Sequence, residues 1–260
     1  MKNIIYYFSG TGNNLAIAKE IASGLGDTTV LPISDLLHHK NIPEEYEWVG
    51  FVAPSYFSHV PPYVEKCMEG VIYSEWQKIF LVAGCAGNRG LSIQDMRKQV
   101  NSSKKNVALE YIVTLPGSYI LSYGAFPVWY QKLSTMLSHR KIRKIVQDIQ
   151  NNRNRKSLGK GIFYKEKYEP ALQESIAKFS AIGMEYHVSD NCSSCGICMK
   201  ICPTENISIE NGKVKFGTDC SQCMGCIQWC PNNAIDYQGK AIHRKRYHHI
   251  DIEKAEMFIR

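Results

Sequence analysis

Two stretches of twelve residues, Cys192–Pro203 (CSSCGICMKICP) and Cys220–Pro231 (CSQCMGCIQWCP), repeat each other at an offset of 28 positions. Each has the spacing C-x2-C-x2-C-x3-C-P, and together they hold eight of the ten cysteines in the chain. Spacings of two residues place successive sulfurs on one tight turn, and a run that ends in Cys-Pro is typical of 4Fe–4S ligation. A structural zinc site favours separated C-x2-C pairs and does not explain this repeat. The repeat therefore predicts two 4Fe–4S clusters.

The cysteine-rich region resembles the bacterial two-4Fe–4S ferredoxins over some 50 residues, and no cluster ligand is missing. In those proteins the fourth cysteine of each run binds the other cluster. The resemblance implies one ligand set of Cys192, Cys195, Cys198 and Cys230, and a second set of Cys202, Cys220, Cys223 and Cys226. We expect residues 184–240 to form a small α+β domain, with short strands at Ile207/Ile209 and Ile235/Tyr237.

The first 115 residues alternate short apolar segments with amphipathic ones. The expected strands are Ile4–Phe8, Thr29–Ile33, Trp48–Pro54, Ile79–Ala83 and Val107–Leu115. The expected helices between them are Asn13–Gly24, Tyr63–Glu69 and Leu91–Val100. This alternation predicts an α/β domain with a doubly wound, parallel, five-stranded sheet.

The turn after the first expected strand reads FSGTGNN, Phe8–Asn14. A P-loop would require a lysine that this turn lacks, and a G-x-G-x-x-G fingerprint would require glycine where Leu15 stands. The remaining interpretation is a cradle for one phosphate, made by backbone N–H groups at a helix start and by short polar side chains. The cradle residues would be Ser9, Gly10, Thr11, Gly12, Asn13 and Asn14.

This pattern resembles the flavodoxins over about residues 1–115, and the resemblance implies bound FMN. Since ligands bind at the carboxyl ends of parallel strands, two later loops should also reach the flavin. They contribute the candidate binding residues Pro54, Ser55, Tyr56, Phe57, Gly84, Cys85, Ala86, Gly87 and Asn88. We expect Tyr56 or Phe57 to stack on the flavin ring and Cys85 to have no catalytic role.

The chain changes character after Leu115. An aromatic segment at Gly117–Pro127 precedes expected helices at Val128–Asn151 and Pro170–Gly183, which extend the first domain to residues 1–183. The strongly basic stretch Arg140–Tyr168 fits either a solvated face or a docking patch for an acidic redox partner. Residues 241–260 form a basic tail that contains HRKRYHH.

The order of these parts resembles the flavodoxin–ferredoxin fusion proteins of anaerobic microbes. That resemblance implies an electron-transfer protein passing electrons between two 4Fe–4S clusters and FMN, and so coupling one-electron and two-electron steps. The alternative is an FMN-dependent reductase of a small molecule, with the aromatics of Tyr119–Phe126 and Trp129 over the flavin and His59 as a proton source. Its catalytic residues are not identifiable from the sequence.

The expected partner is a redox protein, either a ferredoxin or a reductase, or else a small-molecule acceptor. The formal charge of +7 suggests a nucleic-acid or membrane surface, but two clusters and a flavin phosphate would bring the charge close to neutral. We therefore expect no nucleic acid and no membrane. The sequence shows neither a signal peptide nor an apolar span, which predicts a cytoplasmic protein. An oligomer is compatible with the sequence.

Overall fold

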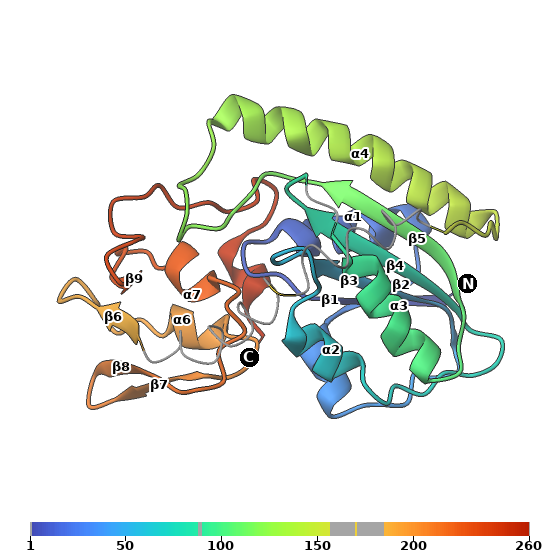
Figure 1. Cartoon of the computed structure of the whole chain (residues 1–260), viewed down its shortest axis with the longest axis horizontal. Coiled ribbons are helices and arrows are strands. Elements are labelled where there is room, and N and C mark those ends of the chain that lie inside the picture. The colour runs from blue at the N-terminus through green and yellow to red at the C-terminus, as the bar shows by residue number, and fades with distance from the viewer. Residues whose placement is uncertain (1, 88–89, 157–169, 171–184, 260) are drawn as a thin grey trace.

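The computed structural model describes residues 2–87, 90–156, 170 and 185–259. Figure 1 shows a large lobe built on a parallel sheet beside a smaller lobe that carries the cysteine repeat. The expected helix at Pro170–Gly183 lies outside the described residues except for Pro170, as do Asn88 and the end of the basic stretch.

The large lobe contains the five predicted strands in one parallel sheet. They are β1 (Lys2–Tyr7), β2 (Thr28–Pro32), β3 (Tyr46–Pro54), β4 (Lys78–Cys85) and β5 (Val107–Thr114). Their order, β2-β1-β3-β4-β5, is that of the flavodoxin-like doubly wound folds. The predicted fold class is therefore confirmed.

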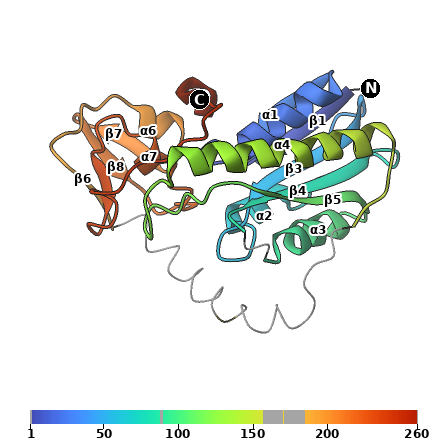
Figure 2. The ribbon, with the colours of Figure 1, turned by 90° about the horizontal axis from the view of Figure 1, so that it is seen from above.

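Helices cover both faces of this sheet because its central strands are apolar on both sides. On one face lie α1 (Asn13–Leu25) and α4 (Val128–Gln150), and on the other α2 (Pro62–Met68) and α3 (Ser92–Ser102). A 3-10 helix, η1 (Ile33–Leu37), packs beside α2. Figure 2 shows α4 running the length of the sheet, with its N-terminal end beside the smaller lobe. The strand ends that face the smaller lobe are the carboxyl ends, where a ligand would bind.

The smaller lobe has two antiparallel strand pairs and two one-turn helices. The strands are β6 (Tyr186–Val188), β7 (Ile207–Glu210), β8 (Lys213–Phe216) and β9 (Ile235–Tyr237), with β6 paired to β9 and β7 to β8. The helices are α6 (Ile197–Lys200) and α7 (Gly225–Gln228), one in each cysteine run. Its core is small and includes Ile207, Ile227, Ile235 and Tyr237. The predicted strands at Ile207/Ile209 and Ile235/Tyr237 are present in β7 and β9.

The segment expected as a basic tail is packed against both lobes. Tyr247, Ile252 and Met257 are buried, and a short 3-10 helix, η3 (Lys254–Met257), ends it. The backbone N–H of His249 donates to the Thr11 carbonyl at 2.9 Å, and that of Ile259 donates to the Lys200 carbonyl at 2.9 Å. These contacts join the smaller lobe to the glycine turn of the larger one, and we call residues 241–259 the C-terminal strap.

None of the helices described within residues 2–87, 90–156 and 185–259 combines the length and the apolarity that crossing a membrane requires.

Candidate cofactor site

A cavity of about 240 Å³ lies at the carboxyl ends of the parallel strands, where the two lobes meet. Its volume is near the lower bound of about 300 Å³ for small-molecule sites. Four loops of the large lobe line it, each following a strand: Ser9–Asn14 after β1, Pro54–Phe57 at the end of β3, Gly84–Ala86 at the end of β4 and Pro116–Ser118 after β5. A fifth wall comes from the smaller lobe, at Gln222–Met224.

The glycine turn after β1 is ordered by its own polar side chains. The Ser9 hydroxyl oxygen accepts hydrogen bonds from the backbone N–H groups of Gly12 at 3.0 Å and Asn14 at 3.3 Å. The Asn13 side chain donates to the Pro116 carbonyl at 3.0 Å and accepts from the Tyr247 hydroxyl at 2.7 Å. Gly12, at φ 92°, adopts the left-handed conformation that turns the chain into α1. The turn is thereby tied to the β5 loop and to the C-terminal strap.

The loop after β3 makes a tight turn with unusual backbone angles. Tyr56 and His59 exchange two backbone hydrogen bonds of 2.8 and 2.9 Å, and between them Phe57 and Ser58 have φ of 48° and 76°. This geometry usually requires glycine or asparagine. Asp95 holds the turn, since its carboxylate lies 3.0 Å from His59 Nδ1 and accepts from the Val60 N–H at 3.1 Å. His59 does not line the cavity.

Three buried polar atoms in the cavity wall have no partner among the described residues. The Ser55 hydroxyl, the Asn14 side-chain oxygen and the Gln222 amide nitrogen are buried and make no hydrogen bond among the described residues. All three residues line the cavity. A Cβ on Gly84 would come within 2.1 Å of Asn14 Oδ1, so a larger residue there would have to displace the Asn14 side chain. Buried polar groups are normally paired, so these atoms fit a ligand that carries donors and acceptors, as a flavin does.

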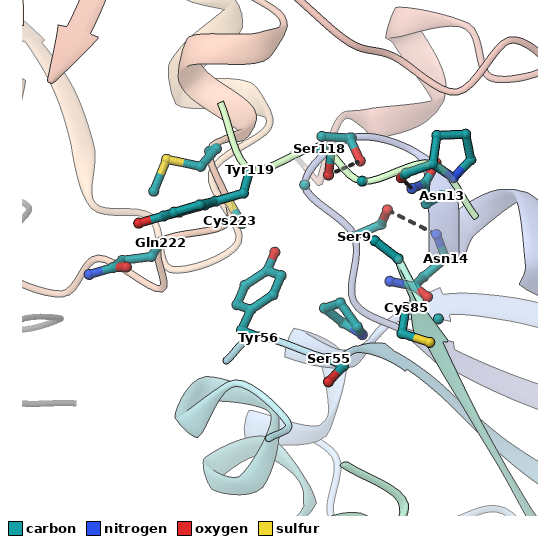
Figure 3. Close-up of a pocket in the computed structure, with 18 of the residues that line it drawn as sticks. Ser9, Asn13, Asn14, Ser55, Tyr56, Cys85, Ser118, Tyr119, Gln222 and Cys223 are labelled. Atoms are coloured by element: carbon teal, nitrogen blue, oxygen red, sulfur yellow. Dashed lines mark hydrogen bonds between the residues drawn. The ribbon is translucent and has the colours of Figure 1, made fainter. Parts of the chain in front are cut away.

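The smaller lobe forms one wall of the cavity and contacts the glycine turn of the large lobe closely. A Cβ on Gly10 would lie 1.9 Å from the Cys223 carbonyl oxygen, so only glycine permits this approach. Figure 3 shows Gln222 and Cys223 on the side of the pocket opposite Ser9 and Asn14, with the Tyr56 ring between them. Burial raises the pKa of the Tyr56 hydroxyl well above its usual value, and the neighbouring Cys223 and Cys220 raise it further. One predicted cluster ligand, Cys223, is therefore part of the cavity wall.

The eight repeat cysteines form no disulfides and gather in two groups. Burial raises the pKa of the Cys198 thiol to about 11, and the nearby thiols that raise it further are Cys195, Cys230 and Cys192. Burial likewise raises the pKa of the Cys226 thiol, and the thiols of Cys223, Cys220, Cys202 and Cys198 raise it further. A small cavity is lined by all four cysteines of the first group. The fold thus places Cys230 with Cys192, Cys195 and Cys198, and it places Cys202 near Cys220, Cys223 and Cys226.

Hydrogen-bond donors lie next to several of the repeat cysteines. Among the described residues, no three His, Cys, Asp or Glu side chains lie close enough to share one metal ion. Backbone N–H groups point at sulfurs, with Asn206 donating to Cys202 at 3.3 Å and Ala234 to Cys230 at 3.3 Å. The Tyr186 hydroxyl lies 3.9 Å from Cys220 Sγ. Such contacts stabilise thiolates and tune the potential of a bound cluster. Cys195 is exposed, so the first group lies nearer the surface.

Most of the predicted flavin residues line the cavity, and two of those that the structure describes do not. The lining ones are Ser9, Gly10, Thr11, Asn13, Asn14, Pro54, Ser55, Tyr56, Phe57, Gly84, Cys85 and Ala86. Gly12 and Gly87 are not in the wall, and Asn88 is outside the described residues.

The sequence interpretation missed Pro116–Ser118, Gln222 and Met224. The first follow β5 at the ligand edge and could have been found by the strand-end rule. Of the aromatic segment, Tyr119 and Tyr123 line the cavity, whereas Trp129 is 68% exposed and does not.

Comparison with family models matches residues 191–235 to the 4Fe-4S dicluster domain, a range that contains all eight repeat cysteines. The comparison with curated proteins gave no match.

Several solved structures are similar to the large lobe. A flavodoxin from Megasphaera elsdenii is 18% identical and has a TM-score of 0.33, with 42% of this chain and 83% of that chain covered. A flavodoxin from Streptococcus pneumonia TIGR4 is 17% identical, with a TM-score of 0.36 and coverage of 45% and 87%. An FMN-dependent NADH-azoreductase from Bacillus anthracis is 8% identical, with a TM-score of 0.35 and coverage of 56% and 100%. We assign the fold from the strand order and not from these low scores.

The strand order and the matched domain define the class of protein. The chain is a fusion of a flavodoxin-like α/β domain with a 4Fe–4S dicluster domain.

Proposed function

We propose that this protein transfers electrons between two 4Fe–4S clusters in the smaller lobe and an FMN in the cavity at the strand ends. The observation that carries the proposal is the position of Cys223, which belongs to one cysteine group and also lines the cavity. A cluster bound by that group would be adjacent to a flavin in the cavity, with no domain movement between them. FMN would supply redox chemistry in one-electron or two-electron steps, whereas each cluster exchanges single electrons.

The two cysteine groups differ in their distance from the cavity, which suggests an order for the path. We call the group of Cys202, Cys220, Cys223 and Cys226 the inner group, because Cys223 lines the cavity. We call the group of Cys192, Cys195, Cys198 and Cys230 the outer group, because Cys195 is exposed. Electrons would enter or leave through the outer group, where a partner protein can approach. This arrangement supports a redox protein as the partner.

Different residues around the cavity suit different parts of FMN. The Ser9–Asn14 turn at the start of α1 suits the phosphate, because N–H groups at a helix start favour anions. Ser55, Asn14 and the aromatic side chains of Tyr56 and Tyr119 suit the ring. Phe57 packs edge-on against Tyr119, with ring centres 5.5 Å apart, and this contact joins the β3 loop to the β5 loop.

One observation favours the second candidate, reduction of a small molecule. Tyr123 lines the cavity and is 37% exposed, so the cavity wall reaches solvent at this residue. A small acceptor could approach a bound flavin there. Rapid oxidation of the pre-reduced protein by one metabolite, at a rate that matches turnover, would support the hypothesis that the protein is a reductase. Slow reaction with every metabolite, together with fast exchange with a ferredoxin, would reject it.

Anaerobic purification followed by iron, sulfide and flavin assays tests the cofactors. We expect close to eight irons and one FMN per chain. Four irons or fewer in an oxygen-free preparation would contradict the two-cluster assignment. Reductive titration against NADH, NADPH, reduced ferredoxin and a panel of metabolites would then identify the donor and the acceptor.

A further inference from the structure

The cysteine repeat provides an internal comparison between its two turns. In the outer turn, Ser194 and Gly196 have φ of 54° and 76°. At the equivalent positions of the inner turn, 28 residues later, Gln222 and Met224 have φ of 52° and 58°. The backbones therefore match, but the inner turn carries long side chains where the outer turn has serine and glycine.

The two turns also differ in what surrounds these side chains. The Ser194 hydroxyl donates to the Gly212 carbonyl, and the atom nearest to a Cβ placed on Gly196 would be Ile209 Cδ1, at 4.0 Å. Gln222 and Met224 are only 4% and 3% exposed, and both line the cavity. The long side chains thus occur in the turn that faces the cavity.

Gln222 is the less easily explained of the two. Met224 packs in the apolar core of the smaller lobe, so burial accounts for it. Gln222 is a long side chain in the left-handed region, which is unfavourable for any residue with a Cβ. Its buried amide nitrogen also makes no hydrogen bond among the described residues. A buried donor without an acceptor destabilises the fold, whereas the hydroxyl of the equivalent Ser194 is paired with the Gly212 carbonyl.

We propose that Gln222 is a flavin-binding residue, contributed by the cluster-binding turn to the cavity of the other domain. Its amide donates a hydrogen bond to a bound flavin, whose ring carries carbonyl oxygens and ring nitrogens as acceptors. The inference rests on the proposed FMN site and makes that site a composite of both domains. Because Cys220 and Cys223 flank Gln222, ordering of this turn by the inner cluster would also order the flavin contact.

The test measures FMN affinity, which does not depend on turnover. The cluster-loaded, flavin-free chain is titrated with FMN under anaerobic conditions, and binding is followed by quenching of flavin fluorescence. We expect Gln222→Ser, which installs the residue of the outer turn, to raise the Kd at least tenfold while iron content stays the same. Ser194→Gln, the matched change in the outer turn, should leave the Kd within twofold of wild type.

A second measurement separates ligand binding from a purely structural role. In the flavin-free, cluster-loaded chain, Gln222→Ser should not lower the apparent Tm, because it removes an unpaired buried amide. If the variant loses iron, Gln222→Gly serves instead, since glycine adopts this φ freely. Iron loss in both variants would assign the side chain to the cluster and overturn the inference.

A Kd unchanged by Gln222→Ser at full iron content would also overturn it. Failure of the wild-type chain to bind FMN would instead contradict the proposed function itself, so the two failures are distinguishable.

Discussion

The indole N–H of Trp229 donates a hydrogen bond of 3.0 Å to the carbonyl oxygen of Gly10, across a separation of 219 residues. Trp229 belongs to the second cysteine run, and Gly10 belongs to the glycine turn after β1. Both residues are buried at the contact between the two lobes. The Trp229 ring is also stacked on His248 of the C-terminal strap, with ring centres 3.9 Å apart. One side chain therefore joins the cluster domain, the flavodoxin-like domain and the strap.

Replacing Trp229 with phenylalanine removes this hydrogen bond and keeps an aromatic ring. The Gly10 carbonyl would be left buried without its partner, which costs about 1–3 kcal/mol. We expect a lower apparent Tm for the cluster-loaded protein, with unchanged iron content. Exposed Trp129 provides the control, since Trp129→Phe should leave the Tm unchanged. Equal Tm values for the two variants would contradict the role of this bond.

Because Gly10 lies so close to Cys223, we predict that adding one methyl group at Gly10 would push the two lobes apart. In Gly10→Ala the new Cβ would overlap the Cys223 carbonyl oxygen, and overpacking of this kind costs about 1–3 kcal/mol. We expect weaker FMN binding together with a lower Tm. Gly26→Ala adds a methyl group where no atom lies within 4 Å, so it should lower stability by backbone strain alone. An unchanged FMN Kd in Gly10→Ala would show that the cavity tolerates separation of the lobes.

The Tyr186 hydroxyl should tune the inner cluster. It lies 3.9 Å from Cys220 Sγ, and hydrogen bonds to cluster sulfurs influence the reduction potential. Removing the donor in Tyr186→Phe should shift the potential of one cluster to a more negative value and leave the other in place. Redox titration followed by electron paramagnetic resonance measures both. Tyr237→Phe is the control, because Tyr237 packs beside Tyr186, with ring centres 5.8 Å apart. A shift of both clusters, or of neither, would contradict the assignment.

Acidification should loosen the C-terminal strap through His249. Burial lowers the pKa of this histidine below its usual 6.5, and its Nδ1 lies 3.3 Å from the Asp251 backbone N–H, which donates to it. The unfolded chain therefore binds the proton more readily, so this contribution to stability is present above about pH 6.5 and is lost as the pH falls. One proton gives a slope of at most about 1.4 kcal/mol per pH unit.

Thermal unfolding between pH 7.5 and 5.5 measures this dependence. In His249→Gln, which keeps an acceptor for the Asp251 N–H but does not titrate, the Tm should fall less over this range. Parallel Tm curves for variant and wild type would exclude His249 as the titrating group.

A buried ion pair predicts the largest loss of stability in the flavodoxin-like domain. The Arg97 guanidinium on α3 donates to both carboxylate oxygens of Glu110 on β5, and the Glu110 side chain is fully buried. Removing one partner of a buried ion pair costs about 3–5 kcal/mol. We expect Arg97→Leu to lower the free energy of unfolding by this amount. The double variant Arg97→Leu/Glu110→Leu should recover most of the loss, and a double variant no more stable than Arg97→Leu would contradict this explanation.

Local patterns predicted the secondary structure closely. The strand at Trp48–Pro54 and the helix at Asn13–Gly24 occur at β3 and α1 with ends shifted by two residues or fewer. Both depend on apolar periodicity and on nearby glycine or proline, which are properties of neighbouring residues. The turn at Tyr56–His59 could not be predicted in this way. Phe57 and Ser58 have left-handed backbone angles, and contacts of this turn with Asp95 and Leu91 stabilise them. Such contacts join residues far apart in the chain.

The separate parts can be predicted from local sequence: a glycine turn after a strand, a doubly wound sheet and two cysteine runs with cluster spacing. These depend on spacing and periodicity within short segments, which the order of residues specifies directly. How the parts meet is seen in the packed fold alone: Cys223 lines the cavity, Gly10 must lack a side chain and Gln222 faces the other domain. Contacts between residues some 200 positions apart in the chain depend on the packing of whole surfaces. No local pattern encodes which surfaces those are.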